Sequence, residues 1–169
     1  VELLDRVSSE QHYLHNTPVV VTRMLDASGG AIEVTDFAPR FEQHGRVFCP
    51  MMIVRRVQRL AGHPRIRVRC RPTQSYGHPL TTITHGSNHI RYVGNPLVLR
   101  LTSDVPVTAI LEENAFFLDD AVTLLRRDRE GRPIVVRPWE VALAAWSRHA
   151  GSNWRGFTVA VCLGAARWC

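Results

Sequence analysis

Short apolar runs recur along the chain about every ten residues, and turn-forming residues separate them, which is the spacing of a β-sandwich or barrel. The first two runs, residues 19–25 and 31–37, flank Ser28-Gly29-Gly30, where glycine supplies the positive φ of a tight turn. Two later pairs flank glycine in the same way: 51–60 with 65–71 around Gly62-His63-Pro64, and 80–85 with 88–93 around Gly86-Ser87. The pattern therefore predicts three β-hairpins.

Three further runs continue the series, at residues 97–102, 107–112 and 121–126. Asn95-Pro96 and Asp119-Asp120 are among the breaks between them. No segment before residue 138 has a sustained apolar period of about 3.6 residues, so we expect little helix there. The sequence predicts an all-β fold, an antiparallel β-sandwich whose strands follow one another as a meander.

Residues 65–71 alternate most clearly between polar and apolar side chains. A period of two residues places alternate side chains on opposite faces of a strand. One face carries the apolar side chains Ile66, Val68 and Cys70 and should be buried. The other carries four arginines, the arginine row: Arg65, Arg67, Arg69 and Arg71. This row is either a solvated face or a surface that docks on another domain, because the planar guanidinium pairs bidentately with carboxylates.

The charge of the chain adds little to this picture. The 169 residues carry a formal net charge of +6, and all 21 basic residues are arginine. Complete avoidance of lysine is more typical of a GC-rich genome than of a selected function. The arginine row lacks interleaved aromatic side chains, and no recognition helix accompanies it, so we expect no nucleic-acid partner.

Composition also bears on location. No apolar run reaches about 18 residues, so we expect no membrane partner, and the first ten residues are too charged for a signal peptide. The chain opens without Met, within a charged strand-like run, and we expect its natural N-terminus to lie upstream. The cysteines form no C-x-x-C pair and are too few for a disulfide scaffold, which favours a cytoplasmic location. They are Cys49, Cys70, Cys162 and Cys169.

The last part of the chain has a different composition, and we divide the sequence into residues 1–137, the β-sandwich domain, and residues 138–169, an atypical tail. All four tryptophans lie in the tail, with many alanines and a single acid, Glu140. Residues 139–149 favour one short helix, which Gly151 and later glycines prevent from continuing, so the rest of the tail is expected to lack regular structure. A frame-shifted translation or an assembly artefact would explain the change of composition.

Several segments in order carry a resemblance to a known family. They are Tyr13-Leu14-His15-Asn16-Thr17-Pro18, Val34-Thr35-Asp36-Phe37-Ala38-Pro39-Arg40, Met52-Ile53-Val54-Arg55-Arg56-Val57, Arg71-Pro72 with Tyr76-Gly77, and Glu113-Asn114-Ala115-Phe116-Phe117-Leu118. Their order and spacing over residues 10–130 resemble the N-terminal β-domain of bacterial glycoside hydrolase family fifteen, which includes glucoamylase, glucodextranase and trehalase activities.

The resemblance implies that this domain is part of an antiparallel supersandwich packed against an (α/α)₆ catalytic barrel of the same polypeptide. It implies inverting hydrolysis of α-glucosides, such as trehalose or α-glucan oligosaccharides, by two glutamates of that barrel, outside this chain. We expect no catalytic residue, metal or cofactor in the chain itself. The family pattern has strands upstream and a Glu-rich linker helix downstream, so we expect a chain truncated at both ends.

Two pairs of histidines could suggest a metal site and two pairs of acids a catalytic site, and each pair has a simpler explanation. His85 and His89 have the spacing of metal ligands on a helix, but Gly86-Ser87 between them favours opposite limbs of a hairpin. His12 and His15 are expected at the surface. Adjacent acids in a strand point to opposite faces, so neither Glu112-Glu113 nor Asp119-Asp120 forms a catalytic pair by itself.

Aromatic side chains leave one more interpretation open, because they stack on sugars as well as filling cores. The candidates are Tyr13, Tyr76, Tyr92, Phe116 and Phe117, the last two expected as core and rim. A free-standing carbohydrate-binding or interaction sandwich is therefore the alternative to a glycoside hydrolase domain. An arginine-rich nucleic-acid-binding β-module is a weaker alternative.

Overall fold

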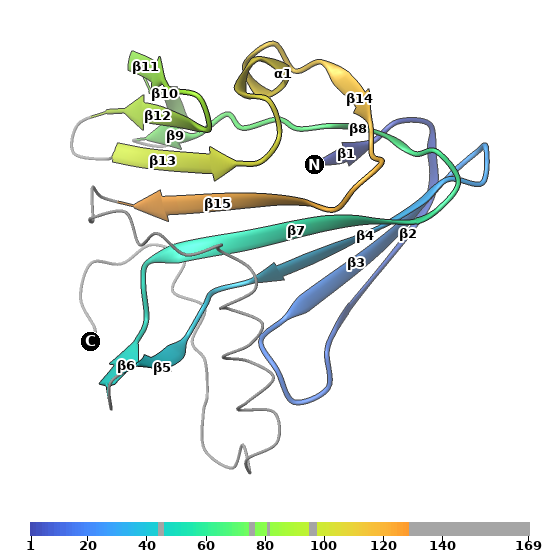
Figure 1. The fold of residues 1–169 in the computed structure, drawn as a ribbon, viewed down its shortest axis with the longest axis horizontal. Coiled ribbons are helices and arrows are strands. Elements are labelled where there is room, and N and C mark those ends of the chain that lie inside the picture. The colour runs from blue at the N-terminus through green and yellow to red at the C-terminus, as the bar shows by residue number, and fades with distance from the viewer. Residues whose placement is uncertain (44–45, 75–76, 81, 95–97, 129–169) are drawn as a thin grey trace.

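The fold is described from a computed structural model, which covers residues 1–43, 46–74, 77–80, 82–94 and 98–128. The largest element is an eight-stranded antiparallel sheet in the order β11-β12-β13-β15-β7-β4-β3-β2, with β15 and β7 side by side at its centre (Figure 1). Its strands are β2 Arg6–Tyr13, β3 Val20–Asp26, β4 Ala31–Phe37, β7 Met52–Ala61, β11 Thr82–His85, β12 His89–Val93, β13 Val98–Ser103 and β15 Val122–Asp128. The all-β antiparallel prediction is confirmed.

A smaller layer covers part of one face of this sheet, which we call the inner face. This layer consists of a three-stranded antiparallel sheet, β1-β8-β14, and the short helix α1 Val107–Leu111 (Figure 1). Its strands are β1 Glu2–Leu3, β8 Arg65–Arg67 and β14 Ala115–Phe117. Two small hairpins complete the described part, β5 Phe41–Gln43 with β6 Arg46–Phe48 and β9 Thr73–Gln74 with β10 His78–Pro79. Within the described ranges, no helix has the length and apolar character to cross a membrane.

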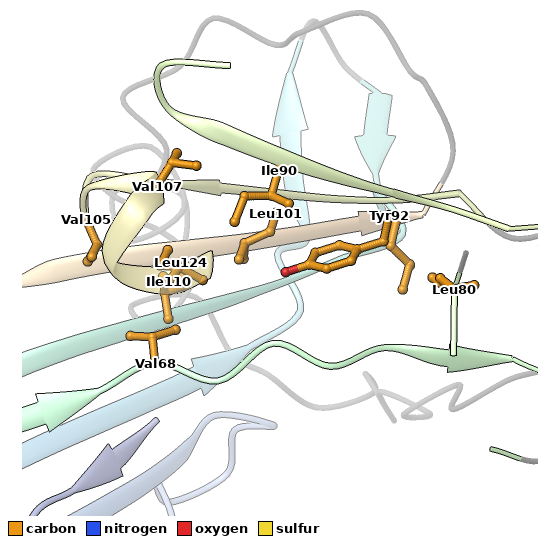
Figure 2. Packing of buried hydrophobic residues seen from close by; sticks show 10 residues of the cluster. Val68, Leu80, Ile90, Tyr92, Leu101, Val105, Val107, Ile110 and Leu124 are labelled. Carbon is orange, nitrogen blue, oxygen red and sulfur yellow. The ribbon is translucent and has the colours of Figure 1, made fainter. Parts of the chain in front are cut away.

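The core between the two layers consists of two clusters of buried side chains. The first lies over β12, β13 and β15 and contains Val68, Leu80, Ile90, Tyr92, Leu99, Leu101, Val105, Val107, Ile110 and Leu124 (Figure 2). The second joins the small sheet to β4 and β7 and contains Leu3, Ile32, Val34, Val57, Ile66 and Leu118. Burial of these side chains, each worth about 1.5–3 kcal/mol, holds the layers together.

Two of the predicted hairpins are confirmed. β3 and β4 pair around residues 27–30, and β11 pairs with β12 in the register His85 opposite Ile90. The first turn depends on Asp26, which is 5% exposed. Its carboxylate accepts hydrogen bonds from the Ser28 N–H (2.8 Å), the Ser28 hydroxyl (2.8 Å) and the Gly30 N–H (2.7 Å). Gly29 has the positive φ, +84°, that the sequence pattern predicted.

The third predicted hairpin is wrong. β7 pairs with β4 and β15, whereas β8 pairs with β1 and β14 in the other layer. Gly62 has φ +63° and packs so tightly that a Cβ atom would lie 2.9 Å from the Cα of Gly30. The chain therefore crosses here from one layer to the other, and the buried side chains Pro64 and Ile66 anchor the crossing.

The predicted strand at residues 107–112 is also wrong, because Val107–Leu111 is helix α1. Val107 and Ile110, three residues apart, lie on one side of a helical turn, and both are buried in the first cluster. A simple meander is wrong as well, since β15 lies between β13 and β7. The proposed tail, residues 138–169, with Cys162 and Cys169, lies outside the described residues.

Candidate interaction surface

The arginine row lies on β8 and its extension, on the side away from the large sheet. Ile66 and Val68 are 0% and 3% exposed, and the partly buried Cys70 packs against the first core cluster, so the predicted apolar face turns toward the core. Strand pairing places Glu2 and Ala115 beside Arg67 on the outer side. The period of two therefore identified both faces correctly.

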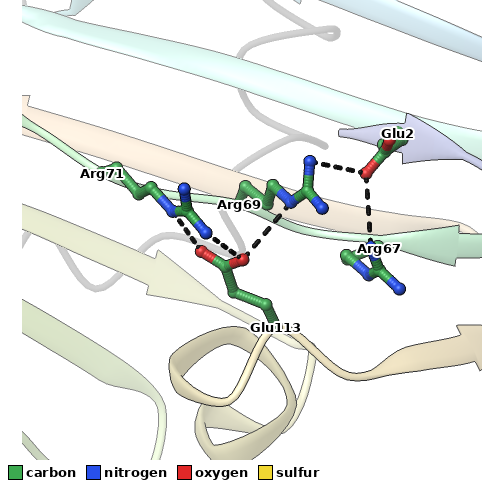
Figure 3. Close-up of polar contacts among 5 residues, drawn as sticks. All are labelled: Glu2, Arg67, Arg69, Arg71 and Glu113. Carbon is green, nitrogen blue, oxygen red and sulfur yellow. Dashed lines mark hydrogen bonds and ion pairs between the residues drawn. The ribbon is translucent and has the colours of Figure 1, made fainter.

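Two glutamates bridge three members of the row (Figure 3). The Arg71 guanidinium donates two hydrogen bonds of 2.6 Å to the carboxylate of Glu113. The Nε atom of Arg69 lies 3.3 Å from Oε2 of Glu113, and its Nη1 atom lies 3.1 Å from Oε2 of Glu2. The Nη1 atom of Arg67 lies 3.8 Å from the same Glu2 oxygen. The row is therefore largely paired within the chain, which sequence reasoning missed because both acids are distant in sequence.

The fourth member, Arg65, has an aromatic partner. Its guanidinium lies 5.6 Å from the centre of the Phe117 ring, and the two residues are cross-strand neighbours. Phe117 remains 56% exposed, whereas Phe116 packs against both core clusters, so the predicted core and rim are confirmed. An exposed aromatic ring beside an arginine is the composition typical of protein interfaces.

Glu113 is held in place by an unusual helix end. Its φ is +54°, in the left-handed region that usually selects glycine. The Asn114 N–H donates to the Ala109 carbonyl (2.9 Å) and the Glu113 N–H to the Ile110 carbonyl (3.3 Å), the two bonds of a Schellman motif. The hydrogen bond from Arg71 lowers the pKa of Glu113, and the same bond raises the pKa of Arg71.

A second ion pair lies on the inner face of the large sheet. Arg55 donates two hydrogen bonds to Asp36, of 2.6 Å and 2.7 Å, across the β4–β7 ladder. The hydrogen bond to Asp36 raises the pKa of Arg55, whose side chain is 40% exposed against 21% for Asp36. Tyr13, 64% exposed, belongs to the same cross-strand row through Val20. Sequence reasoning missed this pair, which only the register brings together.

The two candidate metal-binding histidines are on opposite limbs of the β11–β12 hairpin, as predicted. His85 is opposite Ile90, and His89 is opposite Thr102, so the two side chains point to opposite faces of the sheet. Burial lowers the pKa of His89, and the positive charges of Arg100 and Arg91 add to this. In the described ranges, no group of three metal-ligating side chains comes together. His12 and His15 are exposed, as predicted.

Three of the four candidate acids make contacts with residues outside the proposed pairs. Glu112 is the C-cap residue of α1 and accepts a hydrogen bond from the Asn114 amide (2.7 Å), while Glu113 binds Arg71. Asp119 is exposed and lies 4.0 Å from Arg59, and Asp120 is exposed.

Among the remaining candidates, Tyr92 is buried in the first cluster, where its ring points toward Leu124 and Ile110 (Figure 2). Burial raises the pKa of Tyr92, and its contact with Cys70, which includes a hydrogen bond, adds to this. Tyr76 lies outside the described residues. Cys49 is exposed and forms no disulfide.

No protein-family model, curated protein or solved structure matches this chain.

Proposed function

We propose that the chain is the non-catalytic N-terminal β-domain of a glycoside hydrolase acting on α-glucosides, and that it packs against an (α/α)₆ catalytic barrel of the same polypeptide. The observation that carries the proposal is an unequal pair of layers. Among the described residues, the inner face of the eight-stranded sheet is covered by a sheet of three strands and one short helix. Apart from Tyr76, the family-like segments between Tyr13 and Leu118 lie among the described residues of this fold.

Side-chain exposure supports an incomplete sandwich. The strand register places Ile53 and Ile83 on the same face as the core residues Leu101 and Tyr92. Yet Ile53 is 45% exposed and Ile83 is 51% exposed. Apolar side chains left bare on a core-type face are typical of a surface that another domain covers.

The arginine row is the contact that we propose for the barrel. Three of its four guanidinium groups pair with two carboxylates, and Arg65 lies over an aromatic ring, so the row has two more positive than negative charges among these contacts. Arg65 and Phe117 add an exposed cation and ring at one end. An acidic barrel surface would complement this row, because arginine pairs bidentately with carboxylates.

The function proposed for the chain itself is structural. Glu112 is the C-cap residue of α1 and accepts a hydrogen bond from Asn114, whereas Glu113 binds Arg71. Each acid thus has its own partner. An inverting glycosidase needs a pair of carboxyl groups about 6.5–9.5 Å apart, facing one sugar ring. We assign that pair to the barrel.

A carbohydrate-binding module remains the second candidate, favoured by one observation. Tyr13 is exposed on the inner face, in the row that contains the Asp36–Arg55 pair. An exposed ring on the same sheet face as a carboxylate and a guanidinium offers stacking and hydrogen bonding to a sugar. The nucleic-acid alternative is less favoured, because the glutamates neutralise half of the charge of the arginine row.

The test is the coding DNA downstream of codon 140, read in all three frames. We expect one frame to encode a Glu- and aromatic-rich linker helix followed by a helical barrel with two facing glutamates. Failure to find such a frame would contradict the proposal. As a second measurement, the purified chain is expected to leave trehalose and malto-oligosaccharides intact, and retention on an α-glucan column that free sugar competes away would favour the binding module instead.

A further inference from the structure

Within the described part of the chain, no strand pairs with the outer side of strand β2, so β2 is an edge of the large sheet. It lies at one end of the strand order, and all eight of its residues are exposed. Its ladder with β3 is regular from Ser8 to Tyr13, and an irregularity between Arg6 and Ser8 ends that regular part. A long edge with unpaired backbone groups is a template for another strand.

The direction of these backbone groups follows from two hydrogen bonds at the ends of the ladder. The Leu14 N–H donates to the Val19 carbonyl, and the Ala27 N–H donates to the Asp5 carbonyl, both at 3.0 Å. In an antiparallel ladder, hydrogen-bonded pairs alternate with non-hydrogen-bonded pairs. Every second residue of β2 therefore turns its N–H and C=O groups outward, namely Ser9, Gln11 and Tyr13.

We propose that β2 pairs antiparallel with β2 of a second copy of this chain, about a two-fold axis through Gln11. In this register Gln11 is opposite Gln11 of the second copy, and Ser9 is opposite its Tyr13. The three hydrogen-bonded pairs supply about six backbone hydrogen bonds. The axis passes perpendicular to the sheet, so the two eight-stranded sheets become one continuous sheet with both small layers on the same side.

Hydrogen-bonding complementarity between carboxylate and imidazole selects this register. It places Glu10 opposite His12 of the second copy, twice, in the non-hydrogen-bonded positions where cross-strand side chains are closest. Moving the axis to Glu10 would oppose two carboxylates, which is destabilising. Moving it to Ser9 would draw the irregular residue Val7 into the pairing and oppose Arg6 to His12.

The opposite edge of the sheet, strand β11, is a poorer template for pairing with another strand. Strand β11 has four residues against the eight of β2. The Gly86 N–H donates to the His89 carbonyl (2.9 Å), so Ile83 turns its N–H away from β12 by the same alternation. Ile83 thus provides a control position of matched geometry at the edge that we do not expect to pair.

The experiment is sedimentation equilibrium of the full 169-residue chain from low micromolar to millimolar concentration. We expect a reversible dimer of the 19.1 kDa chain. Gln11→Pro removes an outward N–H and should weaken dimerisation at least tenfold, because proline is tolerated on an edge but cannot donate. Ile83→Pro should leave the dimer unchanged. A monomer at every concentration, or a dimer that Gln11→Pro does not weaken, would overturn the proposal.

A charge exchange tests the register without proline. His12→Glu places two carboxylates opposite each other at both pairs of positions 10 and 12 and should weaken the dimer. The double variant Glu10→Lys with His12→Glu places opposite charges at the same two pairs. Recovery of dimerisation in the double variant is expected. If the double variant dimerises no better than His12→Glu, the register is wrong. Circular dichroism of each variant checks that the monomer is folded.

Discussion

The N–H group of Gly30 donates a 2.7 Å hydrogen bond to the carboxylate of Asp26, which also accepts from Ser28 in the same turn. The carboxylate lies directly where a side chain at position 30 would begin, since a Cβ atom built on Gly30 would collide with Asp26 Oδ2. The β3–β4 turn is therefore specified by close approach at one glycine and by positive φ at the other.

Gly30→Ala is accordingly expected to destabilise the chain more than Gly29→Ala does. Gly29 has φ +84° and open space around it, so alanine there costs only the backbone strain of about 1–2 kcal/mol. Alanine at position 30 must also displace the Asp26 carboxylate. Urea unfolding of the two variants measures the difference, and an equal loss in both would contradict the steric explanation.

Asp26 should make stability depend on pH. The hydrogen bond from the Ser28 hydroxyl, with further bonds from the Gly30 and Ser28 N–H groups, lowers the pKa of Asp26 in the folded state. A lowered pKa contributes stability that is present above the unfolded pKa and is lost as pH falls through the folded pKa. Asp26→Asn should therefore be destabilised at neutral pH and approach the unmodified chain in acid. Thermal melts from pH 7 to pH 2 test this, with the exposed Asp120→Asn as control.

Glu113 stabilises the fold through its ion pairs with arginine and destabilises it through its left-handed backbone, and two substitutions separate these effects. Glu113→Gln keeps the left-handed backbone but removes the charge that binds Arg71 and Arg69. Glu113→Gly removes the same carboxylate and relieves the backbone cost. We expect both variants to melt at a lower temperature, Glu113→Gly by less, and we expect added salt to reduce the gap to the unmodified chain for both. A larger loss for glycine than for glutamine would show that φ is not strained.

The Asp36–Arg55 pair should show measurable coupling. Both side chains are partly exposed, so we expect a coupling free energy of about 1 kcal/mol rather than the value of a fully buried pair. A double-mutant cycle with Asp36→Asn and Arg55→Gln measures it. The pair Arg23–Glu33, in which Arg23 is 57% exposed, should give a smaller value in the same cycle. Equal coupling would mean that the inner face offers no shielding from water.

Sequence patterns predicted much of this fold where the determinants are local. The turn at Ser28-Gly29-Gly30, the hairpin at Gly86-Ser87 and the alternation of residues 65–71 all depend on neighbouring residues. The arginine row was found for that reason. Its partners Glu2 and Glu113 could not be found, because β1 and the end of α1 reach β8 only through the fold.

Two of the wrong predictions, a strand at residues 107–112 and a hairpin after β7, also fail because long-range packing overrides the local pattern. α1 has only five residues, too few to show a helical period, and its β-branched Val107, Thr108 and Ile110 favour a strand locally. Burial of Val107 and Ile110 over the sheet outweighs that preference. The turn after β7 has the glycine of a hairpin, yet the strands β4 and β15 already occupy both edges of β7, so β8 must pair in the other layer.

The order of strands in the large sheet has a consequence for folding kinetics. Each half, β2-β3-β4 and β11-β12-β13, consists of strands adjacent in sequence, but the halves meet through β7 and β15, whose partners Val57 and Val122 are far apart in the chain. Closing such a long loop costs entropy before any contact repays it, so pairing across this seam should limit the folding rate. Substitutions at Val57 would slow folding, whereas substitutions in the outer hairpins would mainly speed unfolding.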